Sequence, residues 1–394
     1  MGVVIGSVLL IVGLLASVIA IWQVVWPFFK RRILKRPDPQ PATTKHIDAL
    51  AQQIKDLESK VTVGPEYLDG LPTAVNQKLR AAYQEARVLQ LEGYQAQSAD
   101  RHREAIDRFA RALALAENDA QRAALYALRG NSYLSISEYH HAEAEYEETL
   151  RLADRISPAE DAARARVPAL GNLGVVSFEQ GDLDKAEEQH KQALFVAKKI
   201  GYHVAEAAAL GNLGLVYRHR GDMNKAEEHL QKALDMQRQI GDRLGQANQL
   251  GNLGNVYHQR GGPGDLDRAE QHFNQALKMH REIGNRSGLA AQLGNLGIVY
   301  ADRGEMGRAE RYFQQALLID REIGSRRGEA DDLNNLGLLY AQRGKLEKAK
   351  EYLQQAQAIY QQIGTGGERP ETVRRALERI EEIERKQREG GEEV

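Results

Sequence analysis

The letters GNLG stand at residues 171–174, 211–214, 251–254 and 294–297, and NNLG follows at 334–337. Successive copies start 40 residues apart, apart from one step of 43. After each copy come two alanines seven residues apart, a spacing typical of one helix face rather than of a strand. These pairs are 186/193, 226/233, 269/276, 309/316 and 349/356. A fixed period of this length indicates a helical-repeat architecture, with one helix-turn-helix unit per repeat.

Glycines mark the ends of the predicted helices. The second helix of each repeat ends at Ile-Gly, as at Gly241, and glycine just past a helix is the expected left-handed cap. The three extra residues fall in the turn at 261–264, so they lengthen a loop and leave both helices intact. A mid-helix glycine costs about 1 kcal/mol relative to alanine. The recurring second glycine of GNLG therefore needs a packing reason, namely a close crossing of two helices.

The pattern L-G-x-x-Y, then Ala, then Phe or Leu, then Ala resembles the tetratricopeptide repeat, and the 40-residue LGNLG form is similar to repeats in kinesin light chains and Pins-type adaptors. Four of the five copies carry the tyrosine, as Tyr217, Tyr257, Tyr300 and Tyr340. Two more degenerate units are marked by Gly93, Ala105, Phe109 and Ala112, and by Gly130, Tyr133, Ala142 and Tyr146. The resemblance implies an all-α, right-handed superhelix of about seven repeats over residues 73–364. A polar capping helix and a charged tail follow over 370–394.

The N-terminal segment predicts a membrane anchor. Residues 2–29 carry no charged side chain, and about 20 apolar residues suffice to cross a bilayer. Basic residues follow the segment at once, in the stretch 30–41, which also holds a Pro-rich spacer. The positive-inside rule then places the N-terminus outside and the repeats in the cytoplasm, as expected for a single-pass protein of a bacterial inner membrane. A cleaved signal peptide is the alternative, but the basic n-region that it requires is absent.

Two features near the N-terminus indicate self-association. Small residues at helical spacing allow two membrane helices to approach closely, and a short coiled-coil-like helix over 42–62 places apolar residues at spacings of three and four. The positions are Gly2, Gly6, Gly13 and Ser17 in the first feature, and Ile47, Leu50, Ile54, Leu57 and Val61 in the second. The alternatives are ordinary transmembrane composition and a helix that folds back on the first repeat.

A recurring asparagine predicts where a ligand binds. It lies about 100° around the first helix from the inward-facing leucine, and the resemblance implies that this helix lines a groove in which asparagine amides hold the backbone of an extended peptide. A bridge between adjacent helices is the alternative role. The asparagine stripe consists of Asn172, Asn212, Asn252, Asn295 and Asn335. Asn248, Asn255 and Gln259 continue it in one repeat, and Arg218 and His258 are the nearest residues able to meet an acidic side chain.

Composition argues against several kinds of chemistry. The chain has no cysteine, which excludes disulfides, thiol catalysis and Cys-containing metal sites, and its net charge of −2 disfavours a nucleic-acid partner. No recognised metal spacing occurs, no cofactor is expected, and His190 stands where other repeats place a core residue. We therefore expect a non-catalytic, membrane-anchored adaptor that binds a peptide-like segment of another protein. The alternatives are a self-associating assembly factor and an accessory subunit of a membrane protein complex.

Overall fold

The chain is helical wherever its structure is described. The computed structural model describes residues 88–97, 101–363 and 368–391, and these ranges contain a helical segment at 88–97, fourteen further helices and no strand. The chain divides into two compact units, Met1–Asn172 and Leu173–Val394. Within the described ranges, no helix is long and apolar enough to cross a membrane. The predicted membrane segment (1–29), the spacer (30–41) and the short helix (42–62) all lie outside the described residues.

The described residues of the first unit, 88–97 and 101–172, contain two helix pairs and the start of a further helix. Gly93 in the 88–97 segment packs against the buried ring of Phe109, and Gly130 packs against the buried ring of Tyr146 in the same way. Side-chain capping begins one helix, where Asn118 accepts a hydrogen bond from the backbone N–H of Gln121 (2.9 Å). The helices are 88–97, α4 (His102–Ala114), α5 (Asp119–Ser135), α6 (Tyr139–Ala153) and the part of α7 (Ala159–Glu179) up to Asn172.

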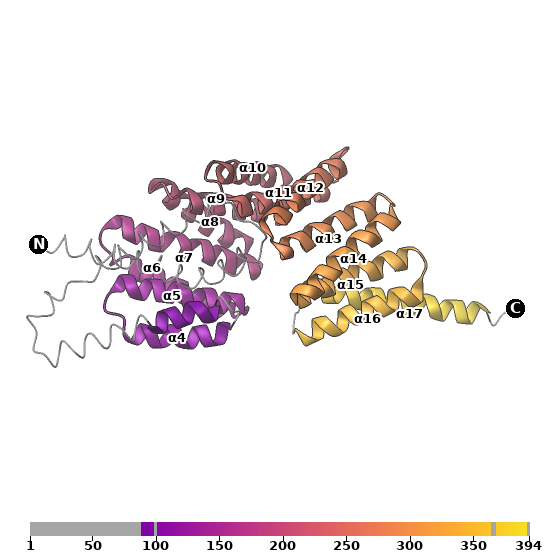
Figure 1. The fold of residues 1–394 in the computed structure, drawn as a ribbon, viewed down its shortest axis with the longest axis horizontal. Coiled ribbons are helices and arrows are strands. Elements are labelled where there is room, and N and C mark those ends of the chain that lie inside the picture. Colours follow the sequence, from indigo (N-terminus) through magenta and orange to yellow (C-terminus); the bar gives the residue numbers. More distant parts are fainter. Residues whose placement is uncertain (1–87, 98–100, 364–367, 392–394) are drawn as a thin grey trace, which may run out of the picture. The chain divides into compact units, whose positions relative to one another are not determined.

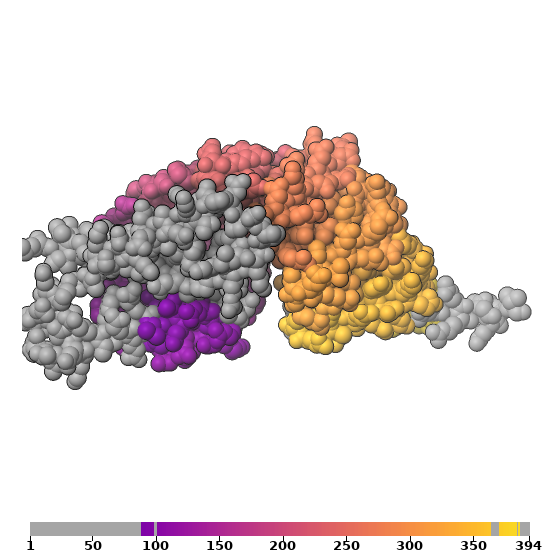
Figure 2. Space-filling view, in the orientation of Figure 1, coloured from indigo at the N-terminus to yellow at the C-terminus, as the bar shows by residue number. Residues whose placement is uncertain are grey.

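The second unit stacks its helices in chain order, and each helix contacts the next (Figure 1). Most of its buried apolar residues form one cluster that runs from Leu213 to Ile380. The side chains of α13–α16, orange to yellow, form a continuous surface in the space-filling view (Figure 2). After the end of α7, the helices are α8 (Leu183–Lys199), α9 (His203–His219), α10 (Met223–Gln239), α11 (Arg243–Arg260), α12 (Asp265–Ile283), α13 (Arg286–Asp302), α14 (Met306–Ile323), α15 (Arg326–Gln342), α16 (Leu346–Gln362) and α17 (Glu368–Gly391).

The second glycine of each GNLG copy lies where the two helices of a repeat cross. A Cβ atom built on Gly254 would come within 2.5 Å of the Phe273 ring, which is itself 1% exposed. The same pairing joins Gly174 to His190, Gly214 to Leu230, Gly297 to Phe313 and Gly337 to Leu353. The predicted packing reason for these glycines is confirmed, because any larger residue would push the two helices apart.

The turns also follow the predicted pattern. Gly221 has φ +81°, and Asp222 beside it accepts a hydrogen bond from the backbone N–H of Lys225 (3.2 Å), so one Gly-Asp pair ends α9 and begins α10. In the longer turn, Gly261 has φ +64° and ends α11, while α12 begins only at Asp265. The three extra residues thus lengthen this turn without shortening either helix.

The last helix, α17, covers the end of the stack. It contacts α16 and α15 and buries Val373 and Ile380, which are 0% and 3% exposed. The rest of its described surface is highly charged, as in the ion pairs of Arg374 with Glu371 and Glu378. An apolar edge on one side and charge on the other is what a terminal helix of a repeat array requires.

Candidate functional site

The asparagine stripe lies at the surface of the first helices of the repeats. Asn212 is half-buried, whereas its neighbours Leu213 and Gly214 are buried against the core. The equivalent residues Asn252, Asn295 and Asn335 are half-buried as well. In the second unit, the first helices α9, α11, α13 and α15 contact one another in that order. The stripe therefore presents one amide from each of four successive helices.

The hydrogen bonds of the stripe differ from one repeat to the next. Asn172 donates to Asn131 of α5 (2.8 Å), so in the first unit this position bridges two helices. Asn252 Nδ2 lies 3.4 Å from Gln249 Oε1 one turn earlier, a weak contact that leaves most of its donor and acceptor capacity open. Asn212 and Asn335 make no side-chain hydrogen bond to any described residue.

Asn295 repeats the weak contact, since its amide nitrogen lies 3.5 Å from the oxygen of Gln292. The bridging role therefore occurs at Asn172, and peptide binding by the other asparagines stays a prediction. A bridge is present at Asn172, and amides with open capacity are present in the four repeats that follow.

Apolar side chains lie beside the amides. Leu215, Ile298 and Leu338 occupy the position three residues after the asparagine, and all three are half-buried. Asn255 holds this position in its own repeat and is also half-buried, while Asn248 and Gln259 are exposed. Such a surface can contact both the backbone amides and the apolar side chains of an extended segment.

The two cationic candidates have different surroundings. His258 Nε2 lies 2.6 Å from Asp302 of α13, so this histidine already faces a carboxylate of its own chain. Arg218 is half-buried, and that partial burial lowers the pKa of its guanidinium. Its nearest polar neighbour is His219, 3.4 Å away. Of the pair, Arg218 is therefore the residue better placed to meet an acidic group of a partner.

A recurring three-residue clamp joins consecutive repeats, and the sequence analysis did not identify it. Tyr257 donates a hydrogen bond to one carboxylate oxygen of Glu227 (2.6 Å), and Arg260 donates to the other (2.8 Å). The other copies are Glu187 with Tyr217 and Arg220, Glu270 with Tyr300 and Arg303, and Glu310 with Tyr340 and Arg343. The signal was present, since glutamate follows the first alanine of the second helix in each of these repeats. In the last repeat Lys350 replaces it.

Three of the four clamp tyrosines, Tyr257, Tyr300 and Tyr340, also stack on a ring of their own repeat, whereas the Tyr217 and His229 rings are tilted by 50°. The Tyr257 and His272 rings lie 5.2 Å apart and are tilted by 11°, and Arg260 lies 4.9 Å above the Tyr257 ring. Burial and the neighbouring Glu227 carboxylate raise the pKa of Tyr257 to about 12. The clamp tyrosines are thus neutral hydrogen-bond donors that fix the spacing of the first helices, and with it the spacing of the asparagine stripe.

No catalytic or metal-binding group stands out among the residues with described positions. Three histidine, aspartate or glutamate side chains do not come together there in a way that could hold a metal ion. His190 is 1% exposed against Gly174, and burial lowers its pKa to about 4. It is a neutral core residue, as its place in the repeat predicted.

Comparison with known proteins supports the repeat architecture. The sequence model of one family, the tetratricopeptide repeat, matches residues 166–239, 205–282, 264–317 and 288–362. A search of curated proteins returns no match.

Solved structures share the fold at low sequence identity. Aspartyl phosphate phosphatase F from Bacillus subtilis is 11% identical with a TM-score of 0.60, and the alignment covers 90% of this chain and 94% of that one. A Rap protein in complex with competence and sporulation factor is 15% identical with a TM-score of 0.57, and covers 86% and 94%. The Rap conjugation gene regulator of plasmid pLS20, in complex with the Phr* peptide, is 15% identical with a TM-score of 0.56, and covers 91% and 96%.

The similarity to these structures concerns the fold, and the family assignment comes from the sequence model. Its matches run together over residues 166–362, half of the 394-residue chain. The glycine crossings, buried alanines and capped turns described above recur throughout that range. The chain therefore belongs to the tetratricopeptide repeat family.

Proposed function

We propose that this protein is a non-catalytic, membrane-anchored adaptor whose cytoplasmic repeats bind an extended peptide segment of a partner protein. The observation that carries the proposal is the asparagine stripe of the second unit, in which four equivalent, half-buried amides stand on successive first helices. An asparagine side chain offers both a donor and an acceptor, the pair that a peptide backbone requires.

Two further observations support the proposal. Apolar side chains at Leu215, Ile298 and Leu338 accompany the amides, so the surface can select a sequence as well as hold a backbone. Of two proteins with a similar fold, one is named in complex with the Phr* peptide and the other in complex with competence and sporulation factor. The anchor is part of the proposal because residues 2–29 are uncharged and long enough to cross a bilayer, with basic residues directly after them.

Site-specific photo-crosslinking in cells tests the peptide-binding surface. A crosslinking amino acid replaces Leu215 or Ile298 on the stripe, and Asn224 on the exposed face of α10 serves as the matched control. We expect both stripe positions to capture the same linear segment of one partner and the control position to capture none of it. Equal capture from all three positions contradicts the proposal.

The captured segment then serves as a synthetic ligand. Asn212→Ala combined with Asn252→Ala removes two amides, each contributing about 0.5–1.5 kcal/mol through hydrogen bonds, so the affinity is expected to fall about tenfold or more. Asn224→Ala is expected to leave it unchanged. An affinity of the double variant within twofold of the wild type would show that the stripe does not hold the peptide.

A further inference from the structure

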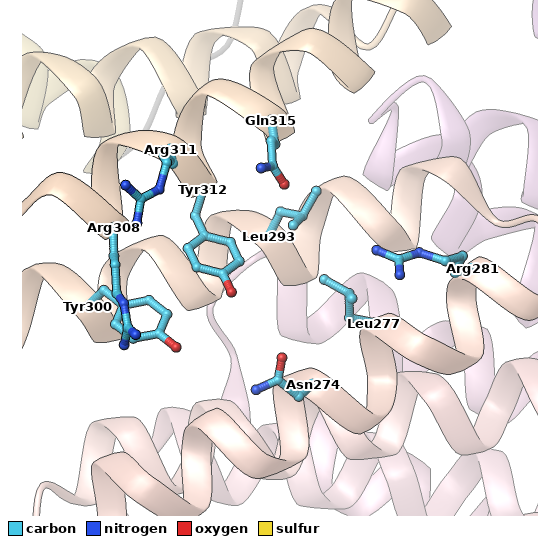
Figure 3. A pocket seen from close by; sticks show the side chains of 9 residues that line it. All are labelled: Asn274, Leu277, Arg281, Leu293, Tyr300, Arg308, Arg311, Tyr312 and Gln315. Carbon is cyan, nitrogen blue, oxygen red and sulfur yellow. The ribbon is translucent and has the colours of Figure 1, made fainter. Parts of the chain in front are cut away.

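A second candidate binding site lies on the second helices of the repeats, away from the asparagine stripe. A pocket of about 320 Å³ opens between α12 and α14, with α13 at its base (Figure 3). Its volume is at the lower end of the range for ligand sites, enough for one or two side chains of a bound peptide. The lining residues are Asn274, Leu277, Arg281, Leu293, Tyr300, Arg308, Arg311, Tyr312 and Gln315.

The pocket is cationic and contains no acidic lining residue. Arg281 and Arg311 are exposed and form no ion pair with any residue of the described ranges, and neither has an acidic residue three or four positions away on its own helix. Arg308 lies 5.2 Å above the Tyr300 ring and pairs with Glu305 (3.0 Å) at the surface. Two guanidinium groups are therefore available to an incoming anion.

The base of the pocket is apolar and rigid. The Tyr300 and Tyr312 rings stack 5.2 Å apart and 13° from parallel, and the clamp bond between Tyr300 and Glu270 fixes the first ring. Leu293 is only 4% exposed, and Leu277 is half-buried beside it. An arginine rim above an aromatic and aliphatic base fits an acidic side chain next to an apolar one.

Neighbouring repeats show that this combination is specific to one position in the array. The basic residues equivalent to Arg281 are Lys198, Arg238 and Arg321, and each of them lies within 4 Å of a carboxylate of its own chain, that of Glu206, Asp235 or Glu329. In the last repeat the equivalent residue is the uncharged Gln361.

The residue at the position of Arg311 is also basic in this repeat alone. Its equivalents are Glu188, Glu228, Gln271 and Glu351, of which three are acidic and none is basic. At the equivalent positions of the other repeats, a basic side chain is either paired with a carboxylate or absent. At the α12–α14 pocket, both arginines keep their positive charge without an acidic partner among the described residues.

We propose that this pocket binds an acidic segment of a partner protein in which glutamate or aspartate flanks a leucine or an aromatic residue. The carboxylates pair with Arg281 and Arg311, and the apolar side chain rests on Tyr312, Leu277 and Leu293. The planar guanidinium group favours such contacts, because it can bind a carboxylate through two parallel hydrogen bonds. This site shares helix α13 with the proposed peptide surface but contains none of the asparagine-stripe residues, so separate variants test the two proposals.

Fluorescence anisotropy with the full-length protein in detergent tests the pocket. The probe is a labelled octapeptide of glutamates around a central Leu-Tyr pair. One control peptide replaces glutamate by glutamine, and another replaces Leu-Tyr by Ser-Ser. We expect the probe to bind and each control peptide to bind at least fivefold more weakly. We also expect Arg311→Glu, which introduces the charge found at the equivalent Glu228 and Glu351, to weaken probe binding at least tenfold.

Matched variants separate the pocket from the general charge of the surface. Lys199→Glu changes the net charge equally at an exposed position of α8 outside the pocket, and we expect less than a twofold change in probe affinity. Arg311→Gln gives an intermediate loss, since glutamine occupies the equivalent position 271. Asn212→Ala with Asn252→Ala leaves probe binding unchanged.

Three results would overturn the proposal. They are equal losses in Lys199→Glu and Arg311→Glu, full affinity for the glutamine or Ser-Ser peptide, and no probe binding together with Arg311-dependent binding to phosphatidylglycerol vesicles. The last result would assign the arginines to a lipid surface. Unchanged thermal melting of the Arg311 variants by circular dichroism confirms that each measurement reports binding and not unfolding.

Discussion

Replacement of Gly254 by alanine is expected to destabilise the protein, although alanine is the better helix former. Gly254 lies inside α11, and a Cβ atom there would stand 2.5, 2.6 and 2.9 Å from three atoms of the Phe273 ring. Carbon atoms in contact are normally 3.5–4.0 Å apart, so the ring has to move by about 1 Å. The ring is 1% exposed and belongs to the continuous core of the second unit, which leaves no free volume for that movement.

The expected magnitude combines two opposing effects. Alanine gains about 1 kcal/mol of helix propensity over glycine, whereas an extra methyl group in a well-packed core typically costs about 1–3 kcal/mol through overpacking. Because the contacts are far below the normal separation, the cost lies at or above the upper end of that range. We expect a net loss of about 2 kcal/mol or more in the free energy of unfolding.

Urea denaturation followed by circular dichroism measures the change, and Gly171→Ala provides the control. Gly171 is the first glycine of its GNLG copy and also lies inside a helix, but a Cβ atom there meets nothing within 4 Å. This control is expected to gain about 0.5–1 kcal/mol from propensity alone. In a Phe273→Ala background, Gly254→Ala is likewise expected to become neutral or stabilising. Destabilisation that persists in that background would refute the steric explanation.

Three further predictions concern ionisable groups and the clamp. Burial and the Asp320 carboxylate raise the pKa of Asp332 to about 8, so the folded state holds this proton more tightly than the unfolded chain does. Stability should therefore fall by up to about 1.4 kcal/mol per pH unit as the pH rises from 4 to 8, and Asp332→Asn should flatten this slope in urea melts. Burial lowers the pKa of His190 to about 4, so the unfolded chain binds this proton at a higher pH than the folded protein does. The free energy of unfolding should therefore decrease as the pH falls from 6.5 to 4. His190→Leu should remove that acid sensitivity in thermal melts at pH 5. Tyr257→Phe deletes the hydrogen bond to Glu227 and should cost about 0.5–1.5 kcal/mol at neutral pH in the same urea assay.

Most of the repeat architecture follows from local sequence patterns. The cap at Gly221, the crossing at Gly254 and the core position of His190 each depend on residues in a single helix pair, so a 40-residue period is enough to place them. The clamp could not be derived in the same way. The tyrosine and the arginine lie 30 and 33 residues after the glutamate, on a helix of the next repeat. A turn separates the two helices, so helical periodicity cannot predict that these side chains face each other.

Local sequence patterns also failed to predict several contacts and charges of the candidate binding surfaces. Periodicity placed the asparagine stripe on the first helices, but it did not show that Asn172 bonds to Asn131, because that contact joins two different helices. The buried carboxyl of Asp332 and the unpaired charge of Arg311 were also missed. In both cases the decisive property is the surrounding charge and solvent exposure, which only the packed helices determine.

The clamps also show which sequence spacing is constant from repeat to repeat and which one varies. The tyrosine stands 30 residues after its glutamate in each of the four copies, including the two on either side of the 43-residue step. The additional residues lie in the turn after Arg260 and before Glu270, between one clamp and the next. The number of residues in that turn can therefore change without altering the 30-residue spacing within any clamp. Arg260 also donates hydrogen bonds to Asp265 across the turn (2.7 and 2.8 Å), so an epitope tag inserted at 261–264 has to leave these two side chains in contact.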